Sequence, residues 1–208
     1  MILVAAAVLI QAQPYVYQKE LDAWRESDAK NPPRSGMILF IGSSTFTNWK
    51  TVNDAFPSRQ VLNRAYGGSG LGHLIRDYKV FSAYRPKQIV IYSGENDLAG
   101  GKTPAHEVVT NFKKLFSLFR RDLPQADILY CAMKPSPSRW HLRAKFMFGN
   151  QEIKDFLSTQ PHADYISCWE AMLGSDERPD PLIFGPDMLH MNPKGYAIWT
   201  RLLGPRLK

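Results

Sequence analysis

The 208-residue chain contains only two cysteines, and it has no CxxC pair of the kind that holds zinc or exchanges disulfides. It also has no HExxH motif, which marks many zinc hydrolases. Cys131 and Cys168 both lie in apolar stretches, so we expect two buried free thiols. These absences argue against a disulfide-stabilised scaffold and against a metal site.

The sequence has no apolar run long enough to cross a bilayer. Residues 1–10 are almost wholly apolar, which is typical of the central part of a secretory signal, with Ala12 as the candidate cleavage point. The basic start of such a signal is missing, because no Lys or Arg precedes Lys19. We therefore expect a weak signal peptide at 1–12, one domain at 13–208 and a secreted or periplasmic protein, with a cytoplasmic protein as the alternative.

Acidic residues are fewer than basic ones, and the formal net charge is +7. Such a balance raises nucleic acid, acidic polysaccharide or an anionic membrane surface as partners. The Lys and Arg residues are scattered along the whole chain, however, and do not form a basic stripe. We therefore expect no nucleic-acid partner, and the sequence leaves the oligomeric state open.

Five short apolar segments alternate with segments of helical period. The first, Met37–Ile41, runs directly into Gly42, which is typical of a strand buried on both faces of a parallel sheet. The other four strands are expected at 61–66, 88–93, 127–132 and 164–168. This alternation predicts an α/β fold, a three-layer α/β/α sandwich with a five-stranded parallel sheet.

Polar or glycine-rich segments follow three of these strands, and a fourth polar segment lies in a late loop. The segments are 42–44, 67–70, 94–97 and 187–190. Open α/β sheets bind their ligands at the carboxyl ends of the strands. A serine there needs a base, and His190 can serve, with Asp187 fixing its tautomer from three residues away. The spacing favours Asp187 over Asp180 without excluding the latter.

The same segments offer hydrogen-bond donors for the oxyanion of an acyl-transfer reaction. The candidates are the Gly68 N–H at a sharp turn, the Asn96 side-chain amide and the Ser44 N–H. Each residue alone has a structural explanation, since serines after strands often cap helices and glycines form turns. Four such segments in chain order on one fold favour a serine hydrolase.

Four blocks resemble those of the SGNH hydrolases, the GDSL lipase and esterase superfamily. They are FIGSSTF at 40–46, NRAYGGS at 63–69, SGEND at 93–97 and DMLHMN at 187–192. The resemblance covers the chain from about residue 36 onward. It implies Ser44 as nucleophile, His190 as base with Asp187 as its partner, and an oxyanion hole made by Ser44, Gly68 and Asn96. It also implies the strand order 2-1-3-4-5 and no cofactor or metal.

Two positions depart from the usual pattern of that superfamily. The usual Gly-Asp-Ser is Gly42-Ser43-Ser44 here, which makes Ser43 a second candidate hydroxyl. Glu95 precedes Asn96 where a small polar residue is commoner. A carboxylate would disfavour a neighbouring oxyanion, so we expect Glu95 to point away or to pair with a cation such as Arg64.

The loop 134–140 should lie on the same rim as the site, so Arg139 and Trp140 are candidate substrate contacts together with Ser43. Trp140 could join Trp49 and Tyr66 in an aromatic floor for a sugar ring, with a core position as the alternative for each. Arg139 and Lys134 could favour an anionic substrate.

The loop lacks a long apolar run or lid helix that would hold a fatty acyl chain. We therefore expect a serine esterase that hydrolyses short-chain acyl esters, such as O-acetyl groups on a small molecule or carbohydrate. A lysophospholipase or thioesterase of the same superfamily is the enzymatic alternative. A non-catalytic binding module on this fold is the alternative from another class, motivated by the altered block at 42–44.

Overall fold

The computed structural model describes residues 14–208, so the predicted signal peptide at 1–12 lies outside the described residues. The chain divides into two compact units on either side of the bond between Pro32 and Pro33. The first unit contains helix α1 (Gln18–Lys30), and the second contains every strand and every candidate site residue. Within residues 14–208, the helices are all too short or too polar to span a membrane.

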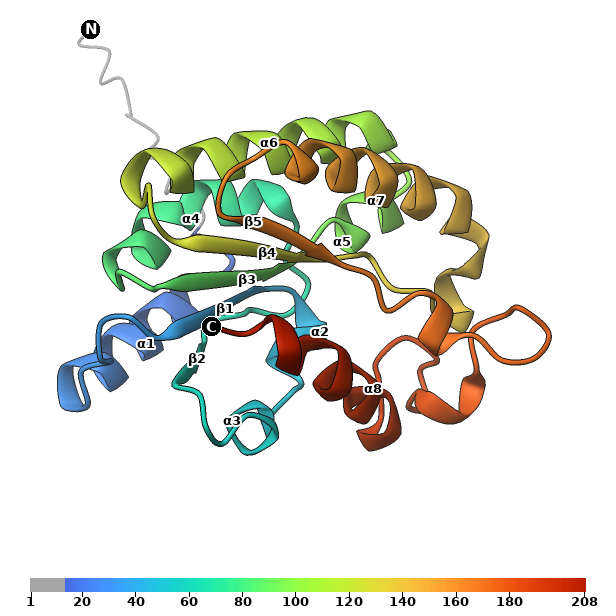
Figure 1. The fold of residues 1–208 in the computed structure, drawn as a ribbon, viewed down its shortest axis with the longest axis horizontal. Helices are drawn as coiled ribbons and strands as arrows, with labels where there is room; N and C mark the ends of the chain where they lie inside the picture. Colours follow the sequence, from blue (N-terminus) through green and yellow to red (C-terminus); the bar gives the residue numbers. More distant parts are fainter. Residues whose placement is uncertain (1–13) are drawn as a thin grey trace, which may run out of the picture. The chain divides into compact units, whose positions relative to one another are not determined.

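Five parallel strands form one sheet in the order β2-β1-β3-β4-β5, which confirms the predicted fold class and strand order (Figure 1). The strands are β1 (Ile38–Gly42), β2 (Val61–Asn63), β3 (Gln88–Tyr92), β4 (Asp127–Cys131) and β5 (Ala163–Ile166). β2 is three residues shorter than predicted, although the N–H groups of Arg64 and Tyr66 still donate to the carbonyls of Phe40 and Gly42 on β1 at 2.8 and 3.0 Å.

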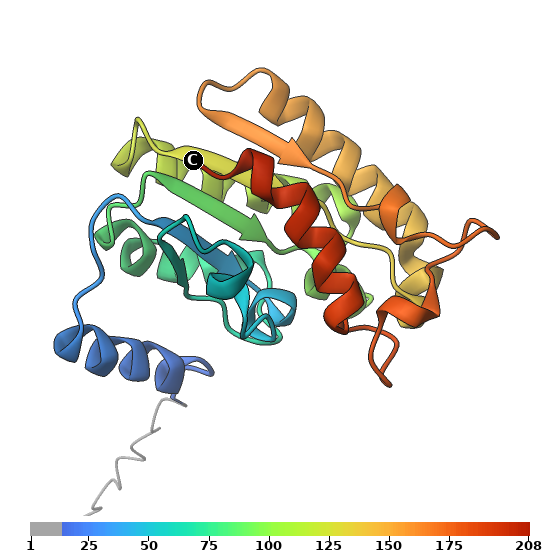
Figure 2. The ribbon, with the colours of Figure 1, turned by 60° about the horizontal axis from the view of Figure 1, so that its bottom comes forward.

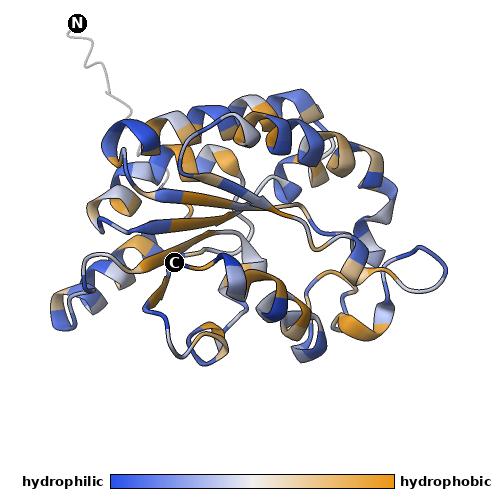
Figure 3. Cartoon of the chain, in the orientation of Figure 1, coloured by the Kyte–Doolittle hydropathy of each residue, from blue (hydrophilic) through white to orange (hydrophobic). Residues whose placement is uncertain are grey.

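Helices cover both faces of the sheet, so the central strands are buried on both sides. One face carries α4 (Leu71–Ala83), α6 (Ala105–Asp122) and α7 (Arg143–Ser158), and the other carries α8 (Pro193–Leu203), which crosses the strands in Figure 2. Figure 3 shows the result, with apolar strands between helices that alternate apolar and polar sides. Short helical segments complete the second unit: α2 (Ser44–Thr47), α3 (Val52–Ala55), α5 (Glu95–Ala99), η1 (Pro137–Leu142), η2 (Glu170–Met172), η3 (Pro181–Ile183) and η4 (Gly204–Arg206).

An aromatic cluster joins α8 to α2 beside the carboxyl edge of the sheet. The ring of Trp199 lies 5.9 Å from that of Phe46, and the ring of Tyr196 stacks on Trp49 at 5.1 Å. The Tyr196 hydroxyl also donates to the carbonyl of Thr45 at 2.8 Å. These contacts fix the start of α8, and therefore the loop that precedes it, relative to the first turn after β1.

Two aromatic residues suggested as a sugar-binding floor belong to the core instead. Trp49 is 2% exposed and Tyr66 is 0% exposed. The Tyr66 hydroxyl donates to Asp77 of α4 at 2.9 Å, which satisfies its polar end inside the protein. The core alternative for Trp49 and Tyr66 is therefore the correct one. Cys131 and Cys168 are buried free thiols, as predicted.

Candidate active site

Ser44 is the first residue of α2 and comes directly after β1. Gly42 has φ +135°, and a Cβ at this position would lie 1.9 Å from the carbonyl oxygen of Tyr92 on β3. Only glycine therefore allows β1 to leave the sheet so close to β3. The Ser43 carbonyl then accepts the N–H groups of Phe46 and Thr47, which starts α2 and presents Ser44 at the carboxyl edge.

A continuous line of hydrogen bonds joins Ser44, His190 and Asp187. His190 Nε2 lies 2.7 Å from Ser44 Oγ, and His190 Nδ1 lies 2.5 Å from Asp187 Oδ2. A carboxylate at Nδ1 favours the tautomer with a proton there, which leaves Nε2 free to accept the serine proton. Asp180 is placed differently, since its side chain accepts the N–H of Leu182 at the start of η3.

The Asp187 carboxylate is held by the loop backbone as well as by the histidine. Its Oδ1 accepts the N–H groups of Leu189 and His190 at 3.0 and 2.9 Å. Burial would raise the pKa of Asp187, but the hydrogen bonds from the His190 ring and from these two N–H groups outweigh it and lower the pKa to about 2. Asp187 is therefore ionised throughout the neutral range.

The loop that carries Asp187 and His190 is closed by its own backbone. Gly185 N–H donates to the carbonyl of His190 at 2.8 Å, and Asn192 N–H donates to that of Ile183 at 3.1 Å. The Asn192 side chain then caps α8, accepting the N–H of Lys194 at 2.9 Å. Met188 adopts φ +53°, which completes the tight turn between aspartate and histidine. Backbone hydrogen bonds on both sides of His190 in the sequence thus fix its position.

Three potential oxyanion donors lie on the segments that follow β1, β2 and β3. The turn after β2 passes beside the serine, since a Cβ on Gly67 would lie 3.9 Å from Ser44 Cβ. Within residues 14–208 the N–H groups of Ser44 and Gly68 donate to no protein acceptor. Gly68 and Asn96 line one small cavity of about 210 Å³. Asn96 Nδ2 donates one hydrogen to the carbonyl of Ser69 at 2.9 Å, which leaves its second hydrogen available.

The three candidate substrate contacts have different surroundings. Ser43 is 3% exposed, so it has almost no surface to offer a substrate. Arg139 is directed to the protein, with Nη2 donating to Asn96 Oδ1 at 2.9 Å and Nη1 lying 3.1 Å from Glu95 Oε1. Trp140 is half-buried and packs against Trp169, with ring centroids 5.9 Å apart. Trp140 is thus the one of the three with accessible surface not committed to the site's own hydrogen bonds.

Glu95 pairs with cations, but Arg64 is the wrong partner. The Glu95 side chain is buried and accepts hydrogen bonds from the Tyr92 hydroxyl and from Lys134 Nζ, in addition to the Arg139 contact. Arg64 instead donates from Nε to the hydroxyl of Tyr84 at 3.0 Å. Sequence reasoning missed Lys134 as a partner, although it follows β4, the strand next to the one that precedes Glu95.

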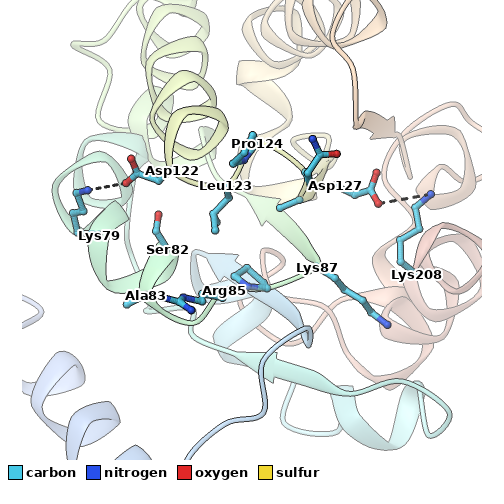
Figure 4. A pocket seen from close by; sticks show the side chains of 13 residues that line it. Lys79, Ser82, Ala83, Arg85, Lys87, Asp122, Leu123, Pro124, Asp127 and Lys208 are labelled. Atoms are coloured by element: carbon cyan, nitrogen blue, oxygen red, sulfur yellow. Dashed lines mark hydrogen bonds and ion pairs between the residues drawn. The ribbon is translucent and has the colours of Figure 1, made fainter.

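A larger cavity lies far from these residues along the strands. It has a volume of about 940 Å³ and opens at the amino ends of β3 and β4, where Lys87 and Asp127 are among its lining residues (Figure 4). Ion pairs tie Lys79 to Asp122 at 2.9 Å and Lys208 to Asp127 at 3.9 Å across its walls. None of the candidate site residues lines it, whereas Gly68 and Asn96 line the smaller cavity.

Residues 40–198 match the model of the GDSL-like lipase/acylhydrolase family, which is most of the chain. The chain belongs to this family. As a GDSL-like acylhydrolase it is a carboxylic ester hydrolase, as the sequence predicted. No curated protein sequence matches the chain.

Solved structures of other proteins resemble this GDSL-like acylhydrolase. A Streptococcus pneumoniae protein provisionally described as a platelet activating factor has 19% identity, covers 92% of each chain and has a TM-score of 0.79. A GDSL-like lipase from Bacteroides thetaiotaomicron has 15% identity over 89% of this chain and 96% of its own, with a TM-score of 0.76. An acetyl-xylooligosaccharide esterase from Geobacillus has 14% identity over 82% of this chain and 94% of its own, with a TM-score of 0.65. At such identities the likeness concerns the fold.

Proposed function

We propose that this GDSL-like hydrolase is a serine esterase that cleaves short-chain acyl esters through Ser44, His190 and Asp187. The observation that carries the proposal is the line of hydrogen bonds from Ser44 Oγ through the imidazole to the Asp187 carboxylate, at 2.7 and 2.5 Å. Serine is a weak nucleophile unless a base lies within hydrogen-bond reach, and here both the base and its orienting carboxylate are in place.

In the first half of the reaction, Ser44 Oγ attacks the ester carbonyl carbon while His190 Nε2 takes the serine proton. The carbonyl oxygen becomes an oxyanion, which accepts hydrogen bonds from the N–H groups of Ser44 and Gly68 and from Asn96 Nδ2. The tetrahedral intermediate collapses, the bond to the alcohol oxygen breaks, and His190 gives its proton to the departing alcohol. Asp187 stabilises the imidazolium while it exists.

In the second half, water attacks the acyl group on Ser44 and His190 takes a proton from that water. The same three donors hold the second oxyanion. Collapse of this intermediate breaks the bond to Ser44 Oγ, which recovers its proton from His190, and the carboxylic acid is released. Apart from the ester and water, both halves of the proposed reaction use only the chain's own side chains and backbone.

A small cavity lined by two of the proposed oxyanion donors, Gly68 and Asn96, supports a short acyl group in the substrate. Its volume of about 210 Å³ is smaller than the roughly 300–1,000 Å³ typical of sites for drug-sized ligands. The acetyl-xylooligosaccharide esterase with the same fold supports an O-acetyl carbohydrate as substrate. Trp140 lies on η1, whose Ser138 N–H donates to the carbonyl of Met188 at 3.0 Å, and this link between η1 and the loop that carries His190 supports Trp140 as a sugar contact. Export, which the apolar residues 1–10 favour, would bring the enzyme to polymeric carbohydrate.

Exposed apolar side chains favour a second candidate, a lysophospholipase or thioesterase. Met188 in the catalytic loop is 39% exposed, and Met147 and Phe148 on α7 are 55% and 49% exposed. Such side chains could contact a longer acyl chain or a lipid surface. Rates for p-nitrophenyl esters from acetate to long-chain acids separate the two candidates. We expect the highest kcat/KM with acetate, and a rise toward long chains would instead select the second candidate.

The nucleophile is tested by mass spectrometry after incubation with a fluorophosphonate. We expect one adduct, located on Ser44 by peptide mapping and lost in Ser44→Ala. The matched control is Ser43→Ala, which removes the neighbouring buried hydroxyl and should still be labelled. An adduct on Ser43 would move the nucleophile by one residue, and the absence of any adduct on the wild type would favour a non-catalytic binding module.

A further inference from the structure

A buried cluster of charged groups lies directly behind the candidate oxyanion hole. Its members are Glu95, Lys134 and Arg139, whose side chains are 3%, 1% and 18% exposed. Both cations contact the Glu95 carboxylate, with Lys134 Nζ at 3.3 Å and Arg139 Nη1 at 3.1 Å. The Tyr92 hydroxyl also donates to it, and burial raises the pKa of Tyr92 well above its usual range, which keeps that proton in place. The carboxylate is thus fully partnered without any contact from the substrate.

Arg139 connects this cluster to Asn96. While Nη1 contacts Glu95, Nη2 donates to Asn96 Oδ1 at 2.9 Å. A guanidinium can only donate and the Ser69 carbonyl can only accept, so the two contacts admit one orientation of the Asn96 amide. Its oxygen faces Arg139 and its NH₂ group faces Ser69, with one hydrogen left for a third partner. That hydrogen is the one the oxyanion needs.

We propose that Arg139, held by Glu95, is a positioning residue that sets the orientation and donor strength of Asn96, and that it is not a substrate contact. The inference rests on the proposed esterase function, because it gives Asn96 a role in binding the oxyanion. A hydrogen bond from a cation to an amide oxygen polarises the amide and strengthens donation from its nitrogen. Arg139 therefore acts through Asn96.

The cluster also explains how this chain accommodates a glutamate beside an oxyanion site. One carboxylate and two cations give a net charge of +1 in a region where water is largely excluded. Lys134 by itself neutralises the Glu95 carboxylate, so Glu95 does not oppose negative charge that develops on the substrate oxygen, and Arg139 remains available to Asn96. Glu95 serves to hold the guanidinium in place, since a lone Arg139 could turn toward solvent.

The test compares Arg139→Met with wild type, using the neutral ester p-nitrophenyl acetate and the anionic mono-p-nitrophenyl succinate. Removing a hydrogen bond from a charged donor should lower kcat by about 10- to 100-fold for both esters, with KM nearly unchanged. Glu95 keeps Lys134 and Tyr92 as partners in this variant, which protects the fold. Arg139→Lys retains the charge, but an ammonium lacks the planar pair of N–H groups that bridges Glu95 and Asn96. Its kcat should therefore lie between those of Arg139→Met and wild type. Lys145→Met, which removes an exposed cation of α7, is the matched control and should keep the wild-type rate.

A double-mutant cycle with Asn96→Ala separates positioning from other roles. Asn96→Ala alone should lower kcat by about 100- to 1,000-fold. If Arg139 acts through Asn96, adding Arg139→Met to that variant should change kcat by no more than about twofold. A full further loss in the double variant would overturn the proposal, as would a KM that rises only for the succinate ester, which is the result expected of a substrate contact. A wild type that hydrolyses no ester and takes no fluorophosphonate would instead refute the esterase function itself.

Discussion

Asp187→Asn should impair this enzyme more than Asp187→Ala does, although asparagine is the more conservative change. The reason is that two backbone N–H groups donate hydrogen bonds to one oxygen of the Asp187 carboxylate. Asp187 Oδ1 accepts the N–H groups of Leu189 and His190, so an asparagine must keep its oxygen at that position. Its NH₂ group then faces His190 Nδ1. A donor there makes Nδ1 an acceptor and moves the ring proton to Nε2, where it blocks acceptance of the Ser44 proton.

The two substitutions should lower kcat by different amounts, because Asp187→Asn changes the tautomer of His190 and Asp187→Ala removes a charge. The corresponding aspartate-to-asparagine change in a serine protease triad lowers kcat by about 10⁴-fold through the wrong tautomer, and we expect a loss of that order here. Alanine leaves the tautomer free, and although it also removes the acceptor of the two loop N–H groups, its main effect on the reaction is the loss of the charge that stabilises the imidazolium. The Asp187 side chain is 51% exposed, so solvent screens this charge. At about 4 Å and a dielectric between that of water and a protein surface, the loss is about 1–4 kcal/mol, or about 5- to 1,000-fold.

The assay is kcat with p-nitrophenyl acetate at pH 8 for both variants, with thermal unfolding of each to show that the loop is retained. We expect the order wild type, then Asp187→Ala, then Asp187→Asn. Equal rates, or a faster Asp187→Asn, would refute the reasoning, because they would mean that the two backbone N–H groups do not fix the orientation of the new amide.

Two further predictions concern stability. The Asp187 pKa of about 2 lies below the unfolded value of about 3.9, so its carboxylate stabilises the fold above about pH 4 and that contribution is lost as the pH falls toward 2. The melting temperatures of wild type and Asp187→Ala should therefore converge over this range, and a constant gap would contradict the assignment. Trp199→Ala should lower the free energy of unfolding by about 3–5 kcal/mol in urea, because Trp199 is 2% exposed and its ring lies 5.2 Å from Tyr92 and 5.9 Å from Phe46. A loss below about 1 kcal/mol would show that the site collapses around the missing ring.

The sheet could be predicted because its strands carry a strong local signal. β1, β3 and β4 are apolar on both faces, and a helical period follows β2, β3 and β4, so the alternation indicates a parallel sheet between helices. The end of β2 carries a weaker signal. Its last predicted residues, 64–66, keep two backbone hydrogen bonds to β1, from the N–H groups of Arg64 and Tyr66, but they are not part of the regular strand.

Aromatic residues near the site were harder to place than the strands. Trp49 and Trp140 both lie within ten residues of the end of a strand that precedes candidate site residues, and the sequence offers no difference between them. Their burial depends on contacts with other elements. Trp49 stacks on Tyr196 of α8 and is buried in the core, whereas Trp140 packs on Trp169 and remains half-buried. Which face of a loop α8 covers is a tertiary property, and no local pattern encodes it.

The partners of Glu95 also depend on tertiary contacts, but here the sequence indicates that a partner is needed. A carboxylate beside an oxyanion donor is unfavourable unless a cation neutralises it, so the sequence requires a partner even though it does not identify one. The strand order then limits the choice, because β4 neighbours β3 and the segment after β4 contains both Lys134 and Arg139. Arg64 follows β2, which lies two positions away from β3 in the sheet. A partner for a polar residue at a strand end is therefore best sought after the adjacent strand, and applied here this rule selects the two cations that the structure places on Glu95.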